Sequence, residues 1–264
     1  MSRKSLQVVL VIACLIFSAS GVASGASIMG SKHDFSALSD GSSGLSKFAG
    51  AFQSAGEDIT ETCVFCHTPH NAAAVPAPGV TGLLWNRTNL ASTSYTLYTS
   101  ATLTSSVYNN MGSGPTGLTL MCMSCHDGIT SIAIGTLINA PYSGTGSNDI
   151  QMSYGFTKDK IGQVYSPTFT NNFQWGVNIG NLTPSMGTTV ADLSNDHPVS
   201  FAWVDNIPGI NNPPWTGNGA ALKLFGSARR MECSTCHDVH NPANPPFLRM
   251  SNSNSDMCTT CHSK

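Results

Sequence analysis

Charged residues are scarce in this 264-residue chain. Lys, Arg, Asp and Glu make up 10% of the sequence, and 12 basic against 14 acidic residues give a formal net charge of −2. Without a run or face of basic residues, the chain lacks the electrostatic signature of a nucleic-acid-binding protein. Beyond its N-terminus it also lacks a hydrophobic stretch long enough to cross a bilayer.

Regular periodicity is scarce as well, since few segments follow the spacing of a long amphipathic helix or an alternating strand. We expect a mostly irregular chain with short helices and a few short strands. Tyr95 to Val107 could form a hairpin, and Phe173 to Ile179 and Val199 to Val204 are strand-like. The Pro-rich segments 211–214 and 241–246 are predicted to be loops.

The N-terminus has the features of an export signal. Arg3 and Lys4 precede an apolar run at 8–17 and a cluster of small residues, which predicts a secretory signal peptide over residues 1–25. An alternative is a lipoprotein signal that would anchor the chain through a lipid on Cys14. Loss of the peptide removes two basic and no acidic residues, so the net charge changes from −2 to −4.

Cysteine and histidine are concentrated in one motif, Cys-x-x-Cys-His, which occurs four times. The copies span residues 63–67, 122–126, 233–237 and 258–262. This run is the attachment signature of a c-type haem. In one tight helical turn, two thiols three residues apart can add to the two vinyl groups of one porphyrin, and the adjacent His then reaches the iron, so we expect a short helix at each motif. Zinc ribbons or disulfides could use the cysteines, but neither explains a His directly after every pair.

The motifs therefore predict four covalently bound haem c groups. The predicted thioether cysteines are Cys63, Cys66, Cys122, Cys125, Cys233, Cys236, Cys258 and Cys261. The predicted proximal iron ligands are His67, His126, His237 and His262. Export agrees with this chemistry, because c-type haem is attached outside the cytoplasm.

Four further histidines remain, one for the distal iron position of each of the four predicted haems. They are His33, His70, His197 and His240. The simplest assignment is bis-histidine ligation of every haem. Met is a possible axial ligand, but the ten methionines are expected to pack against porphyrin faces, where a flexible thioether fits irregular gaps.

The positions of these histidines suggest which haem each one serves. His70 and His240 each follow a proximal His by three residues and cannot reach the other face of the same haem. We expect His70 to ligate the second haem and His240 the fourth. His33 and His197 would then serve the first and third haems in an order that stays open. Asp196 is expected to orient the His197 ring.

One tetrahaem domain is predicted over residues 26–264. It would hold two haem pairs, at about 60–140 and 190–264, with a loop and strand insertion between them. Residues 27–60 would form an arm and a short helix. With so few residues per haem, we expect the chain to wrap around a stack of four haems that supply much of the apolar core.

Six short segments that contain or flank the histidines follow one another along the chain in a characteristic order. They are His33 in the N-terminal arm, Cys-His-Thr-Pro-His at 66–70, Cys-His-Asp-Gly at 125–128, Asp-His-Pro-Val at 196–199, Cys-His-Asp-Val-His-Asn-Pro at 236–242 and Pro-Phe-Leu-Arg at 246–249. This order resembles the OmcE-like tetrahaem cytochromes, which polymerise into extracellular nanowires. The resemblance implies a row of bis-His haems that continues from subunit to subunit. It also implies one distal His that crosses the subunit boundary, with His33 as the best candidate, in a head-to-tail contact that builds a filament.

Three functions are compatible with this chain. The first is an extracellular filament subunit at the cell surface, with identical subunits, envelope redox proteins and extracellular acceptors as partners. The second is a soluble periplasmic electron carrier, and the third is a multihaem reductase. A reductase needs an open iron position, which four spare histidines for four haems disfavour. We therefore expect an electron-transfer protein rather than an enzyme, with low, mostly negative potentials.

Overall fold

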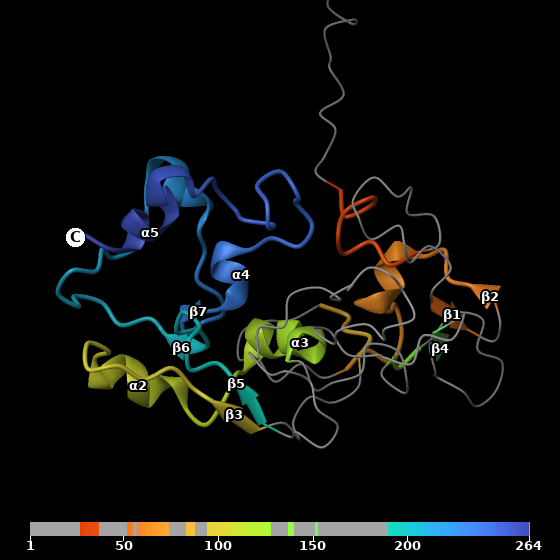
Figure 1. The fold of residues 1–264 in the computed structure, drawn as a ribbon, viewed down its shortest axis with the longest axis horizontal. Coiled ribbons are helices and arrows are strands. Elements are labelled where there is room, and N and C mark those ends of the chain that lie inside the picture. The colour runs from red at the N-terminus through yellow and green to blue at the C-terminus, as the bar shows by residue number, and fades with distance from the viewer. Residues whose placement is uncertain are drawn as a thin grey trace, which may run out of the picture.

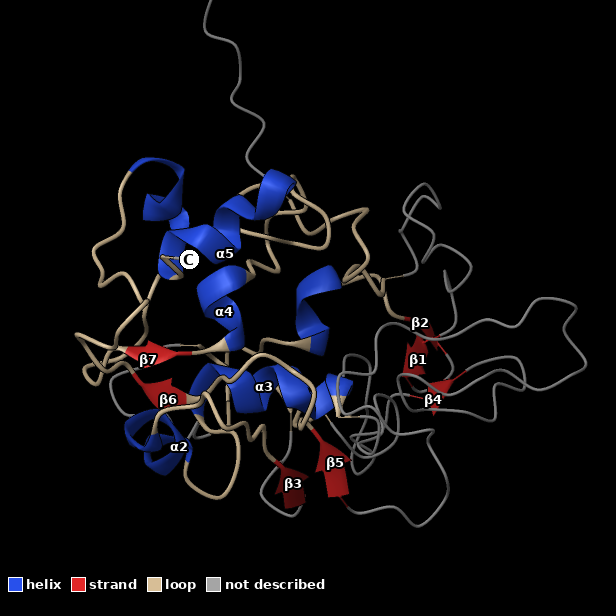
Figure 2. Ribbon diagram, turned by 60° about the vertical axis from the view of Figure 1, so that its left-hand side comes forward, coloured by secondary structure: helices blue, strands red, loops and turns tan. Residues whose placement is uncertain are grey.

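The fold is known from a computed structural model that describes most of the predicted haem-binding chain. It describes residues 27–36, 52–54, 57–73, 83–87, 94–127, 137–139, 151–152 and 190–263. The predicted signal peptide and the predicted strand at Phe173 to Ile179 lie outside these residues. Within them the chain is mostly loop, with short helices and short strands (Figures 1 and 2). This confirms the prediction of an irregular chain with few regular elements.

Each Cys-x-x-Cys-His motif begins or ends on a short helix. The helices are η2 (Thr62–Phe65), α2 (Ser105–Met111), α3 (Gly117–His126), η3 (Gly217–Ala221), α4 (Cys233–Cys236), η4 (Ser253–Ser255) and α5 (Asp256–Cys261). Motifs one to four lie on η2, α3, α4 and α5 in that order, as the spacing of two cysteines on one turn predicts. No helix in the described part of the chain is both long and apolar enough to cross a membrane.

The strands are short and join distant segments. They are β1 (Phe52–Ser54), β2 (Glu57–Asp58), β3 (Ser94–Thr96), β4 (Gln151–Met152), β5 (Val190–Asp192), β6 (Phe201–Ala202) and β7 (Arg230–Met231). β1 pairs antiparallel with β2 and β4, β6 pairs antiparallel with β7, and β3 pairs in parallel with β5. The predicted loops at 211–214 and 241–246 contain neither helix nor strand.

Two local predictions need correction. Tyr95 to Val107 is not a hairpin, because β3 pairs with β5 and the segment continues into α2. Val107 and Met111 are one helical turn apart and both are buried, so they form an apolar face that favours a helix. The strand predicted from Val199 to Val204 is reduced to the two residues of β6.

In its described part, residues 27–36, the N-terminal arm consists of turns, and residues 37–51, where the predicted short helix could lie, are outside the described residues. Asp34 is buried, and its carboxylate accepts hydrogen bonds from the Gly30 and Ser36 N–H groups at 2.7 and 3.1 Å. It also accepts from the Thr62 hydroxyl at 3.0 Å, at the start of η2. The arm is therefore fixed against the first motif.

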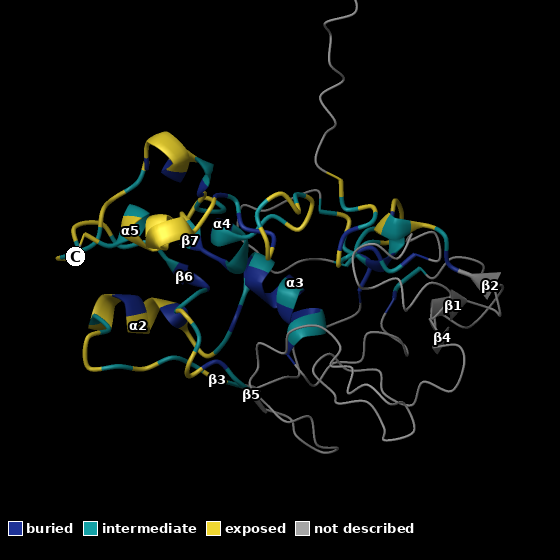
Figure 3. Cartoon of the chain, turned by 45° about the horizontal axis from the view of Figure 1, so that its top comes forward, coloured by how far each residue is buried: buried dark blue, intermediate teal, exposed yellow. Residues whose placement is uncertain are grey.

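The apolar core is divided into small clusters. One consists of Val107, Met111, Phe201 and Met231, and the other of Trp215, Leu222 and Met250. Trp203 packs against both, and its ring meets that of Trp215 edge to face at 5.4 Å. In Figure 3 the buried residues form short stretches along the chain rather than one central layer. The described residues alone therefore form only small apolar clusters.

Buried polar side chains join segments that the small core does not. Asn86 is fully buried and donates hydrogen bonds to the Val64 and Asn139 carbonyl oxygens at 2.7 and 2.9 Å. The side-chain oxygen Oδ1 of Asn86 accepts a hydrogen bond from the Asn139 N–H at 2.9 Å. One amide group thus ties three segments together behind the first motif.

Asn86→Ala should lower the free energy of unfolding by about 3 kcal/mol, because it leaves several buried polar groups without partners. Urea titration followed by circular dichroism measures the change. Asn195→Ala, at an exposed turn position, is the matched control and should have the wild-type midpoint. Equal midpoints for the two variants would show that the Asn86 contacts contribute nothing.

Candidate haem sites

The backbone of each motif closes on itself so that its Cys and His side chains lie on one turn. The His67, His237 and His262 N–H groups donate to the carbonyl oxygen of the first Cys of their own motif, at 2.8, 3.0 and 2.9 Å. His126 is the last residue of α3 and has the same helical relation to Cys122. None of the eight motif cysteines forms a disulfide. Each motif therefore presents two thiols and one imidazole together.

Neighbouring motifs meet through their thiols. Burial, and then the nearby Cys125 thiol, raises the pKa of Cys66 to about 12. The Cys122 thiol hydrogen-bonds to Cys233, which raises the pKa of Cys122 and lowers that of Cys233. Burial, and then the thiols of Cys233 and Cys258, raises the pKa of Cys236 to about 11. These electrostatic interactions follow chain order: Cys66 with Cys125, Cys122 with Cys233, and Cys236 with Cys258.

Three of the spare histidines face a motif histidine across a constant gap. The ring centroids are 6.0 Å apart for His33 and His126, 6.1 Å for His240 and His67, and 6.2 Å for His197 and His262. The planes of His67 and His240 are inclined by 20°, and those of the other two pairs by 79° and 75°. The structure thus brings together six of the eight histidines singled out in the sequence.

Backbone carbonyl groups orient several of these rings. The Nδ1–H groups of His67, His197 and His237 donate to the Leu83, Pro198 and Pro246 carbonyl oxygens, at 2.6, 2.9 and 3.0 Å respectively. A ring that donates from Nδ1 keeps its Nε2 lone pair free to bind a metal. His67, His197 and His237 are therefore held in the tautomer that an iron ligand requires.

His33 is the most strongly perturbed of these histidines. Burial, and then charge repulsion from His126, His237 and His240, lowers the pKa of His33 to about 4. Its ring also packs on Phe247, with centroids 4.6 Å apart. His33 is therefore neutral at physiological pH, the protonation state in which an imidazole can bind a metal.

His70 and His237 complete the set. The His70 side chain is exposed, but its backbone is fixed, because its carbonyl oxygen accepts from Asn139 Nδ2 at 2.6 Å and from the Thr68 hydroxyl at 3.0 Å. Among the described residues, neither His70 nor His237 has a ring partner at the spacing of the other three pairs.

The pairing expected from sequence differs from this geometry. His240 was assigned to the fourth motif but faces His67 of the first, and the second motif meets His33 rather than His70. The cause is the path of the chain, since the arm and the loop after α4 fold back over distant motifs. Asp196 does not orient His197, because the Pro198 carbonyl oxygen holds that ring.

Two residues near the motifs had no signal in the sequence. Glu232 precedes Cys233 and Arg230 lies two residues earlier, and neither belongs to a recognisable metal or haem pattern. The structure places both at the junction of α3 and α4, where they form an ion pair of 3.1 Å.

Comparison with known protein families finds one match. Residues 226–264, which hold the third and fourth motifs, match the family model described as doubled CXXCH motif. This motif is typical of multihaem c-type cytochromes and indicates covalently bound haem c and a role in electron transfer. No curated protein matches the chain.

The number of haems can be counted directly. The intact mass of the exported protein should exceed that of its polypeptide by four haem masses. Cys258→Ala with Cys261→Ala should remove one of them, because both thioether bonds of one porphyrin are lost. Met257→Leu, beside the same motif, is the control and should keep all four. A wild-type protein with fewer than four haems would contradict the prediction.

Proposed function

We propose that this protein is a tetrahaem c-type cytochrome that transfers electrons through bis-histidine haems, as the subunit of an extracellular filament. The observation that carries the proposal is the constant spacing of three pairs of imidazole rings. A reductase is disfavoured, because each of these pairs would occupy both axial positions of one iron.

The ring spacing fits two axial ligands on one metal ion. An imidazole nitrogen binds a transition metal at about 2.0 Å and lies about 1.1 Å from its own ring centre, so two opposed rings have centroids about 6.2 Å apart. The three spacings of 6.0 to 6.2 Å agree with this value. A pair of unrelated histidines has no reason to keep that gap, and each pair contains the His of a different motif.

The fourth pair follows from the resemblance between the first and third motifs. Each continues as Cys-x-x-Cys-His-x-x-His-Asn, at 63–71 and 233–241. His240 of the third motif faces His67 of the first. By the same exchange, His70 of the first would serve the site of His237 in the third. The fixed backbone and exposed ring of His70 suit this role.

When bound, each haem supplies a one-electron ferric/ferrous couple whose potential is low with two His ligands. The protein's residues hold the rings in place and keep the ligands unchanged. The Leu83, Pro198 and Pro246 carbonyl groups fix ring orientation through Nδ1. Phe247 and the N-terminal arm cover the His33 ring.

The order of the motifs supports conduction along the molecule. In Figure 1, α5, α4, α3 and the helix of the first motif (orange) follow one another along the long axis. The thiols of each motif are close enough to those of the next to change their pKa. Cys63 in the first motif and Cys258 in the last are exposed. A path with both ends open at the surface suits subunits that join end to end.

A ligand that crosses between copies would be His70 rather than His33. His33 already faces His126 of its own chain, as His197 and His240 face His262 and His67. A heterologous contact of this kind does not close and so builds a helical filament. The weakly charged surface, with 10% charged residues, imposes little repulsion between copies.

Electron microscopy of the extracellular fraction of producing cells is the direct test of the filament. Thin filaments with a haem path that continues between subunits are the expected result. Compact monomers with four six-coordinate irons would favour the periplasmic carrier. Monomers with one stable five-coordinate iron that binds small molecules would favour the reductase.

His70→Ala should convert one of the four irons from low spin to high spin, because it removes one axial ligand. Electron paramagnetic resonance of the ferric protein measures the change. His240→Ala should produce the same signal and is the positive control. Asn71→Gly, at an exposed neighbour whose φ of 51° suits glycine, should leave the spectrum unchanged.

The same spectra show whether His70 binds an iron of its own chain or an iron of a neighbouring subunit. If the wild-type monomer is fully low spin, His70 acts within its own chain. If the wild-type monomer shows one high-spin iron that disappears on assembly, His70 crosses to a neighbour. A His70→Ala protein that stays entirely low spin would rule out His70 as a ligand.

A further inference from the structure

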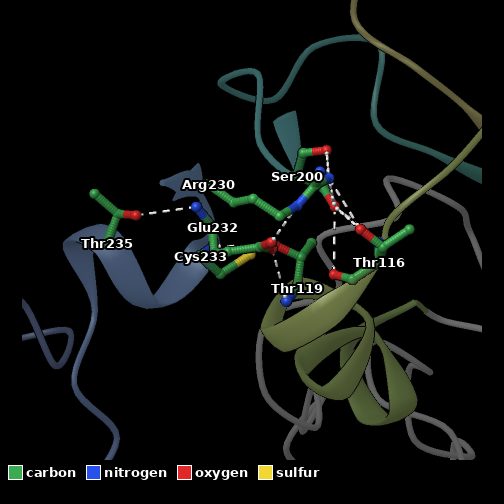
Figure 4. A network of polar contacts seen from close by, with 7 residues as sticks. All are labelled: Thr116, Thr119, Ser200, Arg230, Glu232, Cys233 and Thr235. Carbon is green, nitrogen blue, oxygen red and sulfur yellow. Dashed lines mark hydrogen bonds and ion pairs between the residues drawn. The ribbon is translucent and has the colours of Figure 1, made fainter. Parts of the chain in front are cut away.

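The junction between the second and third motifs contains a buried charge pair (Figure 4). Glu232 is 2% exposed, and its carboxylate accepts hydrogen bonds from the N–H of Thr119, at 3.1 Å, and from the Thr119 hydroxyl. Arg230 Nε donates to the other carboxylate oxygen at 3.1 Å. The carboxylate of Glu232, the residue before α4, is therefore bonded to the first turn of α3.

The side chains around the Glu232 carboxylate also form hydrogen bonds. The Thr119 hydroxyl also accepts the Cys233 N–H at 3.1 Å, and the Thr235 hydroxyl accepts the Glu232 N–H at 2.9 Å. Arg230 Nη2 donates to the Thr116 hydroxyl at 2.9 Å and to the Ser200 carbonyl oxygen. The pair is thus held rigidly between α3, β7 and α4.

The position of the pair matters because two haem attachment points meet there. The thiols of Cys122 and Cys233, the first cysteines of the second and third motifs, lie within hydrogen-bonding reach of each other. Glu232 is adjacent to Cys233 in the chain, and the Cys233 N–H shares Thr119 with its carboxylate. Glu232 and Arg230 lie at this junction, and two more guanidinium groups, those of Arg87 and Arg249, donate to the Ser124 and Ser234 carbonyl oxygens on α3 and α4.

We infer that the Glu232–Arg230 pair sets the reduction potentials at the junction between the second and third motifs. The inference rests on the proposed function, since it needs a haem on each motif. Reduction adds one negative charge, which a nearby buried carboxylate opposes and a nearby guanidinium favours. Water screens such charges poorly at a buried site, and potentials of ligated iron respond to burial and local charge.

A purely structural clamp is the competing explanation, and charge-retaining variants separate the two. Glu232→Gln keeps the size of the side chain and removes its charge. Glu232→Asp keeps the charge and shortens the side chain, so it disturbs the clamp more. Electrostatic tuning predicts a shift in Glu232→Gln alone, whereas a clamp predicts the larger effect in Glu232→Asp.

The test is a spectroelectrochemical titration of the complete haem-loaded protein. In Glu232→Gln we expect two of the four couples to move to more positive potential, with an about tenfold higher ferrous-to-ferric ratio at fixed potential, equivalent to about 59 mV for one electron. The double variant Glu232→Gln with Arg230→Gln removes both charges and should return towards the wild-type potentials.

If the Glu232→Gln protein fails to take up haem, the reduction potentials of the Arg230→Gln protein test the same inference. This substitution leaves the carboxylate without its partner and should move the same two couples to more negative potential. The titration is run at alkaline pH, because burial raises the pKa of Glu232. Shifts of the same sign in Arg230→Gln and Glu232→Gln, or equal shifts in Glu232→Asp and Glu232→Gln, would overturn the inference.

The wild-type titration keeps this test separate from the proposed function. Four low-potential couples in the wild type support bis-His haems, whatever the variants do. Wild-type couples well above zero would contradict the proposed function. Unchanged couples in a folded, fully loaded Glu232→Gln protein would contradict only the role of the charge pair.

Discussion

The gap of about 6 Å between opposed imidazole rings is the constraint on which most of the described structure depends. Three such pairs join segments that are far apart in sequence, and one of them places the arm at 27–36 against the end of α3. Among the described residues the apolar clusters are small. A group bound between the rings would therefore add stability to these segments.

Buried polar side chains fix the positions of the loops and helices around the motifs. Asn86 and Asp34 fix loops around the first motif, and Glu232 joins α3 to α4. Each of these side chains is buried and fully bonded, so each specifies one arrangement of its loops. Such fixing is what a series of redox groups requires, because their relative positions control how electrons pass from one to the next. The charge of Glu232 adds an electrostatic contribution to the positional one.

The sequence predicts the elements that depend on local spacing. Two cysteines on one turn require a short helix, and the four motif helices are confirmed, as are the loops at the Pro-rich segments. Local spacing cannot show which distant segments meet. The assignment of His240 to the fourth motif failed for this reason, because the loop after α4 lies over His67. The hairpin at Tyr95 to Val107 failed because the spacing of Val107 and Met111 favoured a helix.

The histidine count and the geometry lead to the same remaining question. Four spare histidines for four motifs predict complete ligation, and the structure pairs three of them within one chain. The fourth, His70, stands on a rigid backbone with its ring in solvent. An exposed ring of this kind needs little reorganisation to bind either in its own chain or in a neighbour. The choice between a carrier and a filament therefore depends on one side chain, because the other three distal candidates are already committed within the chain.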